Sequence, residues 1–141
     1  MSVQKIKIKL VDFWPENEIV NLYKAGGWWK EHYDSSKLKY LIKGSFAFAV
    51  AVDKNLGIAI GMGRVISDGV SDAYIQDLIV LSEYRDSGIG RELVKKLLKY
   101  CLSKKVKWIG LIAEPNQHGF YSNIGFKTLS NYTPMKYEQD D

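Results

Sequence analysis

The sequence contains one cysteine, three prolines and no apolar run that approaches the length of a membrane-spanning helix. A single cysteine excludes an intramolecular disulfide and a metal centre built on clustered cysteines, so we expect no metal site. A transmembrane helix needs roughly 20 consecutive apolar residues, and the lysine-rich start of the chain lacks the apolar segment of a secretion signal. We therefore expect a cytoplasmic protein without a membrane partner.

Charge of neither sign dominates, because 20 Lys and Arg residues face 16 Asp and Glu residues and leave a net charge of +4. Hydrophobic residues make up 46% of the chain, which is typical of globular proteins and excludes a disordered chain. The length of 141 residues predicts one domain, 1–141. The mild positive charge suits an anionic partner, either a cofactor that carries phosphates or a nucleic acid. The lysines between 95 and 107 form either a solvated helix face or a contact with such a partner.

Apolar runs and alternating patterns bounded by turn residues predict six strands. The expected strands span residues 5–11, 46–53, 57–66, 72–81, 107–113 and 132–137. Apolar residues at helical spacing predict four helices. The expected helices span residues 16–25, 35–43, 88–103 and 117–123.

The order of these elements is β-α-α-β-β-β-α-β-α-β, which predicts an α/β (α+β) fold with a mixed, mainly antiparallel central sheet and helices on both faces. The strand at 72–81 should run parallel to the strand at 107–113 through a right-handed crossover. A serine is the expected cap of the helix at 35–43. Cys101 falls on the apolar face of the helix at 88–103 and is interpreted as a buried, inert thiol.

Glycines open the longest predicted helix, where Gly88 and Gly90 let the backbone approach a ligand closely. The first amides of a helix lack internal partners and carry partial positive charge, so this turn can cradle phosphate oxygens. Arg85 and Arg91 can add charge-assisted hydrogen bonds. A Walker loop would need lysine where Arg91 stands, and a dinucleotide fingerprint would need glycine where Leu93 stands, so neither motif fits.

The pattern Arg85-x-x-Gly88-x-Gly90, between a strand and a helix, resembles the acetyl-CoA signature Gln/Arg-x-x-Gly-x-Gly/Ala of the GNAT superfamily of N-acetyltransferases. The segment 78–80 is similar to the strand that precedes this signature, and the segment 119–126, GFYSNIGF, resembles the family's FYxxxGF ending. The similarity covers roughly residues 57–137. It implies a single N-acetyltransferase domain of the GNAT fold with acetyl-CoA as cofactor, and it leaves room for a homodimer.

The resemblance also implies which residues bind the cofactor. They are Leu78, Ile79, Val80, Arg85, Asp86, Ser87, Gly88, Ile89, Gly90, Arg91 and Asn116. The family's two parallel strands separate at a bulge, and the amide corresponding to that of Leu78 faces the thioester carbonyl, where it stabilises developing negative charge. Asn116 precedes Tyr121 by five residues where seven is usual, so its role is open.

Tyr121 matches the family's general acid, which protonates the coenzyme A thiolate after direct attack by the amine in a ternary complex. The base that deprotonates the amine is open among Asp77, Glu114 and a chain of water molecules. His118 is interpreted as a residue of a helix surface.

The family builds its acceptor pocket from the N-terminal helices, which here carry Trp28, Trp29 and Asp34. Aromatic faces with Asp34 or Asp77 suit a cationic amine. We therefore expect a small-molecule amine, such as a polyamine, an arylalkylamine or an amino acid derivative, with a protein N-terminus or lysine as the alternative.

Two competing classes are a non-catalytic acetyl-CoA-binding sensor or scaffold and a basic nucleic-acid-binding domain. We expect no nucleic acid partner, because the aromatic-bearing strands lack an RNA-binding signature.

Overall fold

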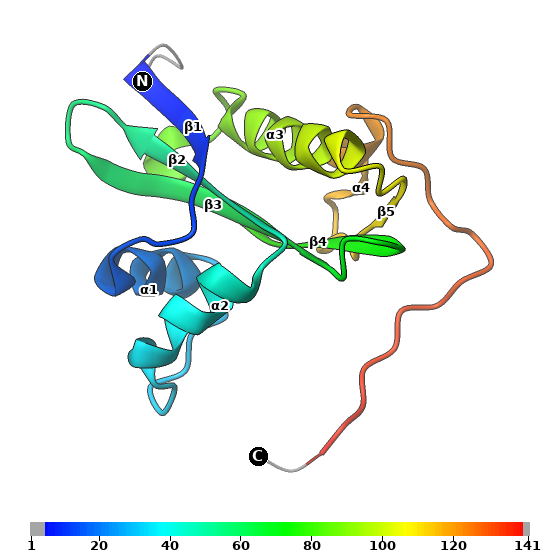
Figure 1. Cartoon of the computed structure of the whole chain (residues 1–141), viewed down its shortest axis with the longest axis horizontal. Coiled ribbons are helices and arrows are strands. Elements are labelled where there is room, and N and C mark those ends of the chain that lie inside the picture. Colours follow the sequence, from blue (N-terminus) through cyan, green and yellow to red (C-terminus); the bar gives the residue numbers. More distant parts are fainter. Residues whose placement is uncertain (1–4, 140–141) are drawn as a thin grey trace. The chain divides into compact units, whose positions relative to one another are not determined.

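The computed structural model describes residues 5–139 and contains one five-stranded sheet within that range (Figure 1). The strands follow one another in sequence order across the sheet: β1 (Ile6–Leu10), β2 (Ala47–Asp53), β3 (Ile58–Ser67), β4 (Asp72–Val80) and β5 (Trp108–Gly110). Pairing is antiparallel from β1 to β4 and parallel between β4 and β5. The predicted mixed, mainly antiparallel sheet is therefore confirmed, as is the parallel crossover through the long helix.

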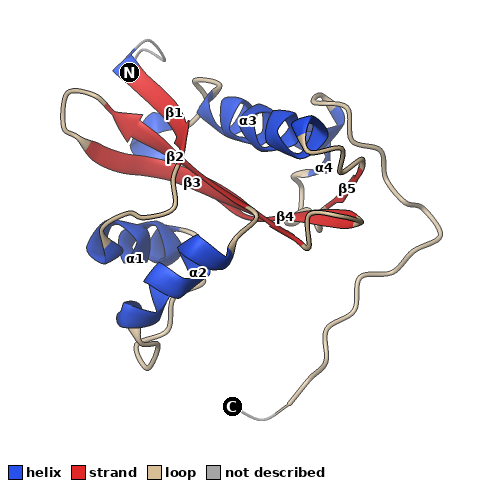
Figure 2. Cartoon of the chain, viewed as in Figure 1, coloured by secondary structure: helices blue, strands red, loops and turns tan. Residues whose placement is uncertain are grey.

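Three α-helices cover the two faces of this sheet (Figure 2). α1 (Glu16–Ala25) and α2 (Leu38–Gly44) pack on one face, and α3 (Ile89–Ser103) packs on the other. Because successive side chains of a strand point to opposite faces, one strand can serve both helix layers. Met62 of β3 packs in the cluster beneath α1, whereas Gly61 and Gly63 lie under α3 close to Leu93 and Leu97.

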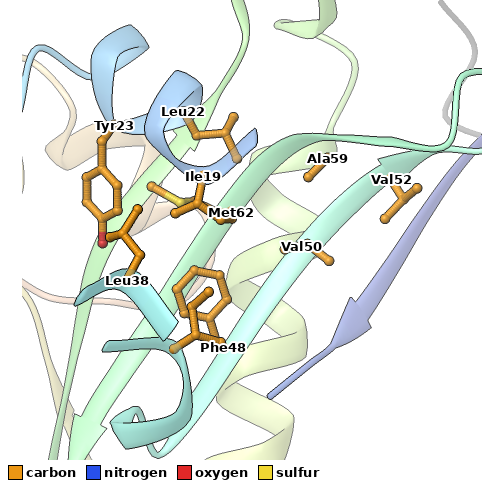
Figure 3. Close-up of a cluster of buried hydrophobic side chains, with 10 residues drawn as sticks. Ile19, Leu22, Tyr23, Leu38, Phe48, Val50, Val52, Ala59 and Met62 are labelled. Atoms are coloured by element: carbon orange, nitrogen blue, oxygen red, sulfur yellow. The ribbon is translucent and has the colours of Figure 1, made fainter. Parts of the chain in front are cut away.

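The cluster between the sheet and the N-terminal helices is the core that holds the first helices in place (Figure 3). It joins Ile19, Leu22 and Tyr23 of α1 to Leu38 and Ile42 of α2 and to the inward side chains of β2 and β3. The apolar periodicity of residues 16–25 predicted α1 with its observed bounds. On the opposite face, Cys101 of α3 is fully buried, and burial raises the pKa of its thiol, so its interpretation as a buried thiol is confirmed.

The predicted helix at 35–43 is interrupted and is capped differently from the expectation. A 3-10 turn, η2 (Ser35–Lys37), precedes α2. The Asp34 carboxylate accepts a hydrogen bond from the Ser36 amide at 3.0 Å, so the cap is Asp34 and the expectation of a serine cap was wrong. Both residue types cap helices through a side-chain oxygen, and composition alone does not choose between neighbours.

The chain divides into two compact units, and residues 112–139 are the described part of the second. This unit contains one short helix, α4 (His118–Ser122), which confirms the helix expected at 117–123. The strand expected at 132–137 is absent from the described chain, and that prediction was wrong. Pro134 removes an amide donor, and the large side chains of the segment are left exposed rather than divided between a buried and a solvent face. They are Tyr132, Met135 and Tyr137.

The strand expected at 107–113 is also shorter than predicted, since β5 covers Trp108–Gly110. None of the helices within residues 5–139 combines the length and the apolar character that crossing a bilayer requires.

Candidate functional site

A β-bulge interrupts β4 in the middle of the sheet. In the register with β3, Met62 lies opposite Ile79 and Arg64 lies opposite Gln76, so that Gly63 alone faces two residues of β4, Asp77 and Leu78. The extra residue is Asp77, whose φ of 60° lies in the left-handed region. A Cβ at Gly63 would lie 3.1 Å from Cδ1 of Leu78, so the facing strand leaves little room for a side chain beside the bulge.

The same strand loses its other neighbour just before the bulge. The parallel ladder between β4 and β5 joins Asp72, Ala73 and Tyr74 to residues 108–110 and ends there, although β4 continues to Val80. The β4 edge from 75 to 80 is therefore left without strand pairing to β5. This separation matches the opening between the strands at 72–81 and 107–113 that the resemblance implied.

Beyond the end of β4, the loop at 85–90 leads into α3 through two left-handed residues, Asp86 at φ 63° and Gly88 at φ 84°. A Cβ at Gly88 would meet no atom within 4 Å, so the backbone here borders open space at the start of a 15-residue helix. The first amides of α3, at Ile89 and Gly90, lack intrahelical acceptors, and the helix dipole adds positive charge. This turn can accommodate the phosphates of a cofactor such as acetyl-CoA.

Side-chain contacts hold this loop on the sheet. The Arg85 Nε donates to the Val80 carbonyl at 2.8 Å, and the Ser87 hydroxyl donates to the Tyr84 carbonyl at 2.7 Å. The hydroxyl of Tyr84, in η3 (Ser82–Tyr84), donates to the buried carboxylate of Asp53 at 2.6 Å. This hydrogen bond lowers the pKa of Asp53, so the acceptor is ionised.

Sequence reasoning missed the role of Asp53. Its one signal was a carboxylate at the end of the apolar run 46–53.

The remaining cofactor-binding candidates lie on the same elements. Leu78 occupies the bulge, Ile79 packs against the core beneath α1, and Ile89 is buried in the first turn of α3. Arg91 is exposed in that turn. The candidates at 78–80 and 85–91 thus share one unit of the chain and follow one another along β4, the loop and α3.

A pocket of about 350 Å³ opens beside α1 and α2. The three residues predicted for the acceptor, Trp28, Trp29 and Asp34, all line it. The rest of the wall consists of Tyr33, which belongs to the same segment, and of Tyr23, Lys37, Leu38 and Leu41, which sequence reasoning did not assign. Mutual ring contacts stiffen this wall: Trp28 and Trp29 lie 6.1 and 6.4 Å from Tyr23, and Tyr33 lies 5.4 Å from Trp29, between ring centroids. The pocket is therefore mainly aromatic, with Asp34 and Lys37 as its charged groups.

Asp77 is bound by two side chains from other elements. The Tyr23 hydroxyl donates to its Oδ2 at 2.7 Å, and the Arg64 Nε donates to the same oxygen at 2.6 Å. The Arg64 and Asp77 side chains are 16% and 21% exposed, so this ion pair is largely shielded from water. Burial and the neighbouring Asp77 carboxylate raise the pKa of Tyr23, whose phenol therefore keeps its proton. Local sequence patterns could not reveal this pairing, because Asp77 lies 54 positions after Tyr23.

The second unit holds Tyr121, Asn116 and Glu114. Tyr121 lies in α4 with its ring in edge-to-face contact with Phe120 and Phe126, at centroid distances of 5.0 and 5.8 Å. Burial, and to a lesser extent Glu114, raises the pKa of the Tyr121 phenol. Asn116 has a left-handed φ of 68°. His118 is exposed at the start of α4. The roles assigned to Tyr121, Asn116 and Glu114 stay predictions.

The sheet thus has a parallel pair that opens next to the start of a helix, and an aromatic pocket lies on the same unit of the chain. Residues 20–137 match the family model described as an acetyltransferase (GNAT) domain. The chain therefore belongs to the GNAT family of acetyltransferases.

Individual relatives agree with this family. A GNAT-family acetyltransferase from Streptococcus pneumoniae TIGR4 has a similar structure, with a TM-score of 0.79 and 30% identity over 96% of this chain and 99% of that one. An uncharacterized N-acetyltransferase, ycf52, of Porphyra purpurea is 29% identical over 85% of this chain and 73% of its own length. The chloroplastic GCN5-related N-acetyltransferase 2 of Arabidopsis thaliana is 40% identical over 48% of this chain. That match spans about a quarter (26%) of the Arabidopsis protein.

Proposed function

We propose that this chain transfers the acetyl group of acetyl-CoA to the primary amine of a small molecule by direct attack in a ternary complex. The observation that carries the proposal is the turn at Gly88, where a left-handed glycine opens a long helix onto free space. It lies on the same unit as the unpaired edge of β4 and the aromatic pocket.

Acetyl-CoA would supply an acetyl group activated as a thioester. The amides at the start of α3 would bind its pyrophosphate, and Arg85 and Arg91 would add charge-assisted hydrogen bonds. The free edge of β4 would pair with the amide groups of the pantetheine arm, with Asn116 as a further contact. The Leu78 amide would donate to the carbonyl oxygen that gains negative charge during the reaction.

Proton transfer falls to Tyr121 and to a base. A phenol whose pKa is raised by burial is protonated at neutral pH, which suits Tyr121 as the donor to the leaving sulfur. The amine arrives mostly as an ammonium and must lose its proton, either to a carboxylate or through a chain of water molecules. Glu114 and Asp77 are the candidate carboxylates for this deprotonation.

The acceptor would bind in the aromatic pocket. Its wall of tyrosine and tryptophan rings suits an apolar or aromatic body, and ring faces with the Asp34 carboxylate attract a cationic amine. A volume of about 350 Å³ is that of a small-molecule site. We therefore place small aromatic and aliphatic amines ahead of peptides.

The decisive experiment measures release of free thiol from acetyl-CoA in the presence of polyamines, arylalkylamines, amino acids and peptides. An amine-dependent rate that saturates with one class supports the proposal and names the acceptor. Trp29→Ala should then raise the acceptor KM while the Kd for coenzyme A stays the same. Tight binding of coenzyme A without thiol release for any amine would instead indicate a sensor or scaffold.

A further inference from the structure

Asp77 adopts a backbone conformation that is uncommon within a strand. Its φ of 60° lies in the left-handed region, which few residues other than glycine, asparagine and aspartate adopt. It is also the extra residue of the β4 bulge and so lacks a regular partner on β3. A contact outside the strand ladder therefore helps to hold it in place.

The Asp77 carboxylate provides that contact. Its Oδ2 accepts hydrogen bonds from Tyr23 in α1 and from Arg64 in β3, at 2.7 and 2.6 Å. Hydrogen bonds to an ionised acceptor are stronger than neutral ones, and partial burial strengthens them further. The side chain thus ties the bulge to two elements whose own positions are fixed by the core.

Tyr23 serves two structures at once. Its ring lines the aromatic pocket and contacts Trp28 and Trp29, while its hydroxyl is bound to Asp77. A ligand that moves the Tyr23 ring or restricts its motion therefore acts on the bulge through the hydrogen bond between Tyr23 and Asp77. The next residue along β4 is Leu78, whose amide direction depends on the conformation of Asp77.

We propose that Asp77 is a positioning residue rather than the base, and that the Tyr23–Asp77–Arg64 network couples the aromatic pocket to the bulge that orients the Leu78 amide. This inference rests on the proposed function, because it assigns the two ends of the network to acceptor and thioester. Two donors already occupy the carboxylate oxygen that the network uses, and their loss would release the bulge.

The test compares Asp77→Asn, Tyr23→Phe and the double variant in the full chain, with Arg64→Lys as the conservative change. Misplacing a reacting group by about 1 Å costs roughly 100-fold in rate, so we expect Asp77→Asn to lower kcat by about 10- to 100-fold. The Kd for coenzyme A should stay within about twofold, since the phosphates bind at a separate turn. Tyr23→Phe should lower kcat less and also raise the acceptor KM.

The double variant tests whether Tyr23 and Asp77 act through one network. Residues of one hydrogen-bond network show non-additive effects, so the double variant should be no slower than Asp77→Asn alone. The matched controls are Asp12→Asn and Tyr40→Phe, which change exposed residues and should leave every parameter unchanged.

Two results would overturn the inference while leaving the proposed function intact. One is a double variant whose losses multiply. The other is an Asp77→Asn variant that loses the acidic limb of its kcat/KM profile while Tyr23→Phe has normal kinetics, as expected if Asp77 is the base.

The proposed function fails if the wild type releases no thiol with any amine. The coupling between Tyr23 and the bulge can still be tested in that case, from the NMR spectrum of the backbone amides. Tyr23→Phe should shift the Leu78 amide resonance, and an unchanged resonance would refute the coupling.

Discussion

The Tyr121 phenol lies in an environment that keeps its proton in place. Burial raises its pKa above the ordinary value of about 10, so the donor form is complete at neutral pH and is lost only when the pH passes the raised value. Tyr121→Phe should lower kcat by roughly 10²–10⁴-fold, the usual contribution of a general acid. Steady-state kinetics and calorimetry with coenzyme A check this, and the Kd should stay unchanged.

The matched control is Tyr132→Phe, which alters an exposed phenol of the same unit. The wild-type kcat should also show no decline that depends on Tyr121 between about pH 7 and 10. A Tyr121→Phe variant with normal turnover would remove Tyr121 from the mechanism and leave water as the acid.

Substitutions at Gly88 test the turn proposed to bind phosphate. They can separate the effect of backbone strain from the effect of a side chain that fills the phosphate site. Valine at φ 84° is strained, and its side chain would enter the space proposed for phosphate. Gly88→Val should abolish binding of coenzyme A in calorimetry. Gly57→Val is a matched control, because Gly57 also has a left-handed φ, 70°, and a Cβ there would also meet nothing within 4 Å.

Both variants should lose similar stability, by roughly 1–2 kcal/mol from the left-handed conformation, but only Gly88→Val should lose the cofactor. Gly88→Asn sharpens the comparison, since asparagine tolerates this conformation better. Retained binding in both Gly88 variants would show that the phosphates lie elsewhere.

The β4 bulge depends on a small residue in the facing strand. A methyl group at Gly63 would lie 3.1 Å from Cδ1 of Leu78 and 3.2 Å from Cδ1 of Leu97, so these side chains would have to shift by a few tenths of an ångström. We expect Gly63→Ala to destabilise the fold by about 1–3 kcal/mol, as overpacking does, and to lower kcat more than it weakens coenzyme A binding. Urea denaturation and steady-state kinetics measure the two effects.

Gly44→Ala is the control for this change, because a Cβ at Gly44, the last residue of α2, would meet no atom within 4 Å. Its stability should be unchanged or slightly increased. If Gly63→Ala were as stable and as active as this control, the bulge would not require close contact with β3.

Most helices and strands could be predicted from local patterns, because the apolar period of each segment is set by the face that it buries. α1, α3 and the hairpin of β2 and β3 follow this rule. The segment at 132–137 does not, since its tyrosine and methionine side chains are a strand signal only if another strand is available to pair. Strand pairing depends on residues far away in the sequence, so the spacing of apolar residues within one segment cannot predict it.

The candidate site shows the same division between local and distant information. The turn at Gly88 could be predicted because its glycines, arginine and helix start are adjacent in the sequence. The Tyr23–Asp77–Arg64 network and the support of Tyr84 by Asp53 could not, because the chain that separates their members is 13 to 54 residues long. Only the folded sheet, with α1 across it, brings these groups together. Self-association of the chain stays a prediction.

Within the described residues, the protein offers no accessible thiol that could carry an acetyl group, which favours the proposed direct transfer over a covalent intermediate. Cys101 is the sole cysteine, is fully buried in α3, and has a thiol pKa raised by burial, so it is neither accessible nor ionised. Direct transfer requires both substrates to be bound at once. Initial-rate plots against acetyl-CoA at several amine concentrations should therefore give intersecting lines, and Cys101→Ala should give the same pattern. Parallel lines, the signature of ping-pong transfer, would mean that some other side chain carries the acetyl group and would refute direct attack.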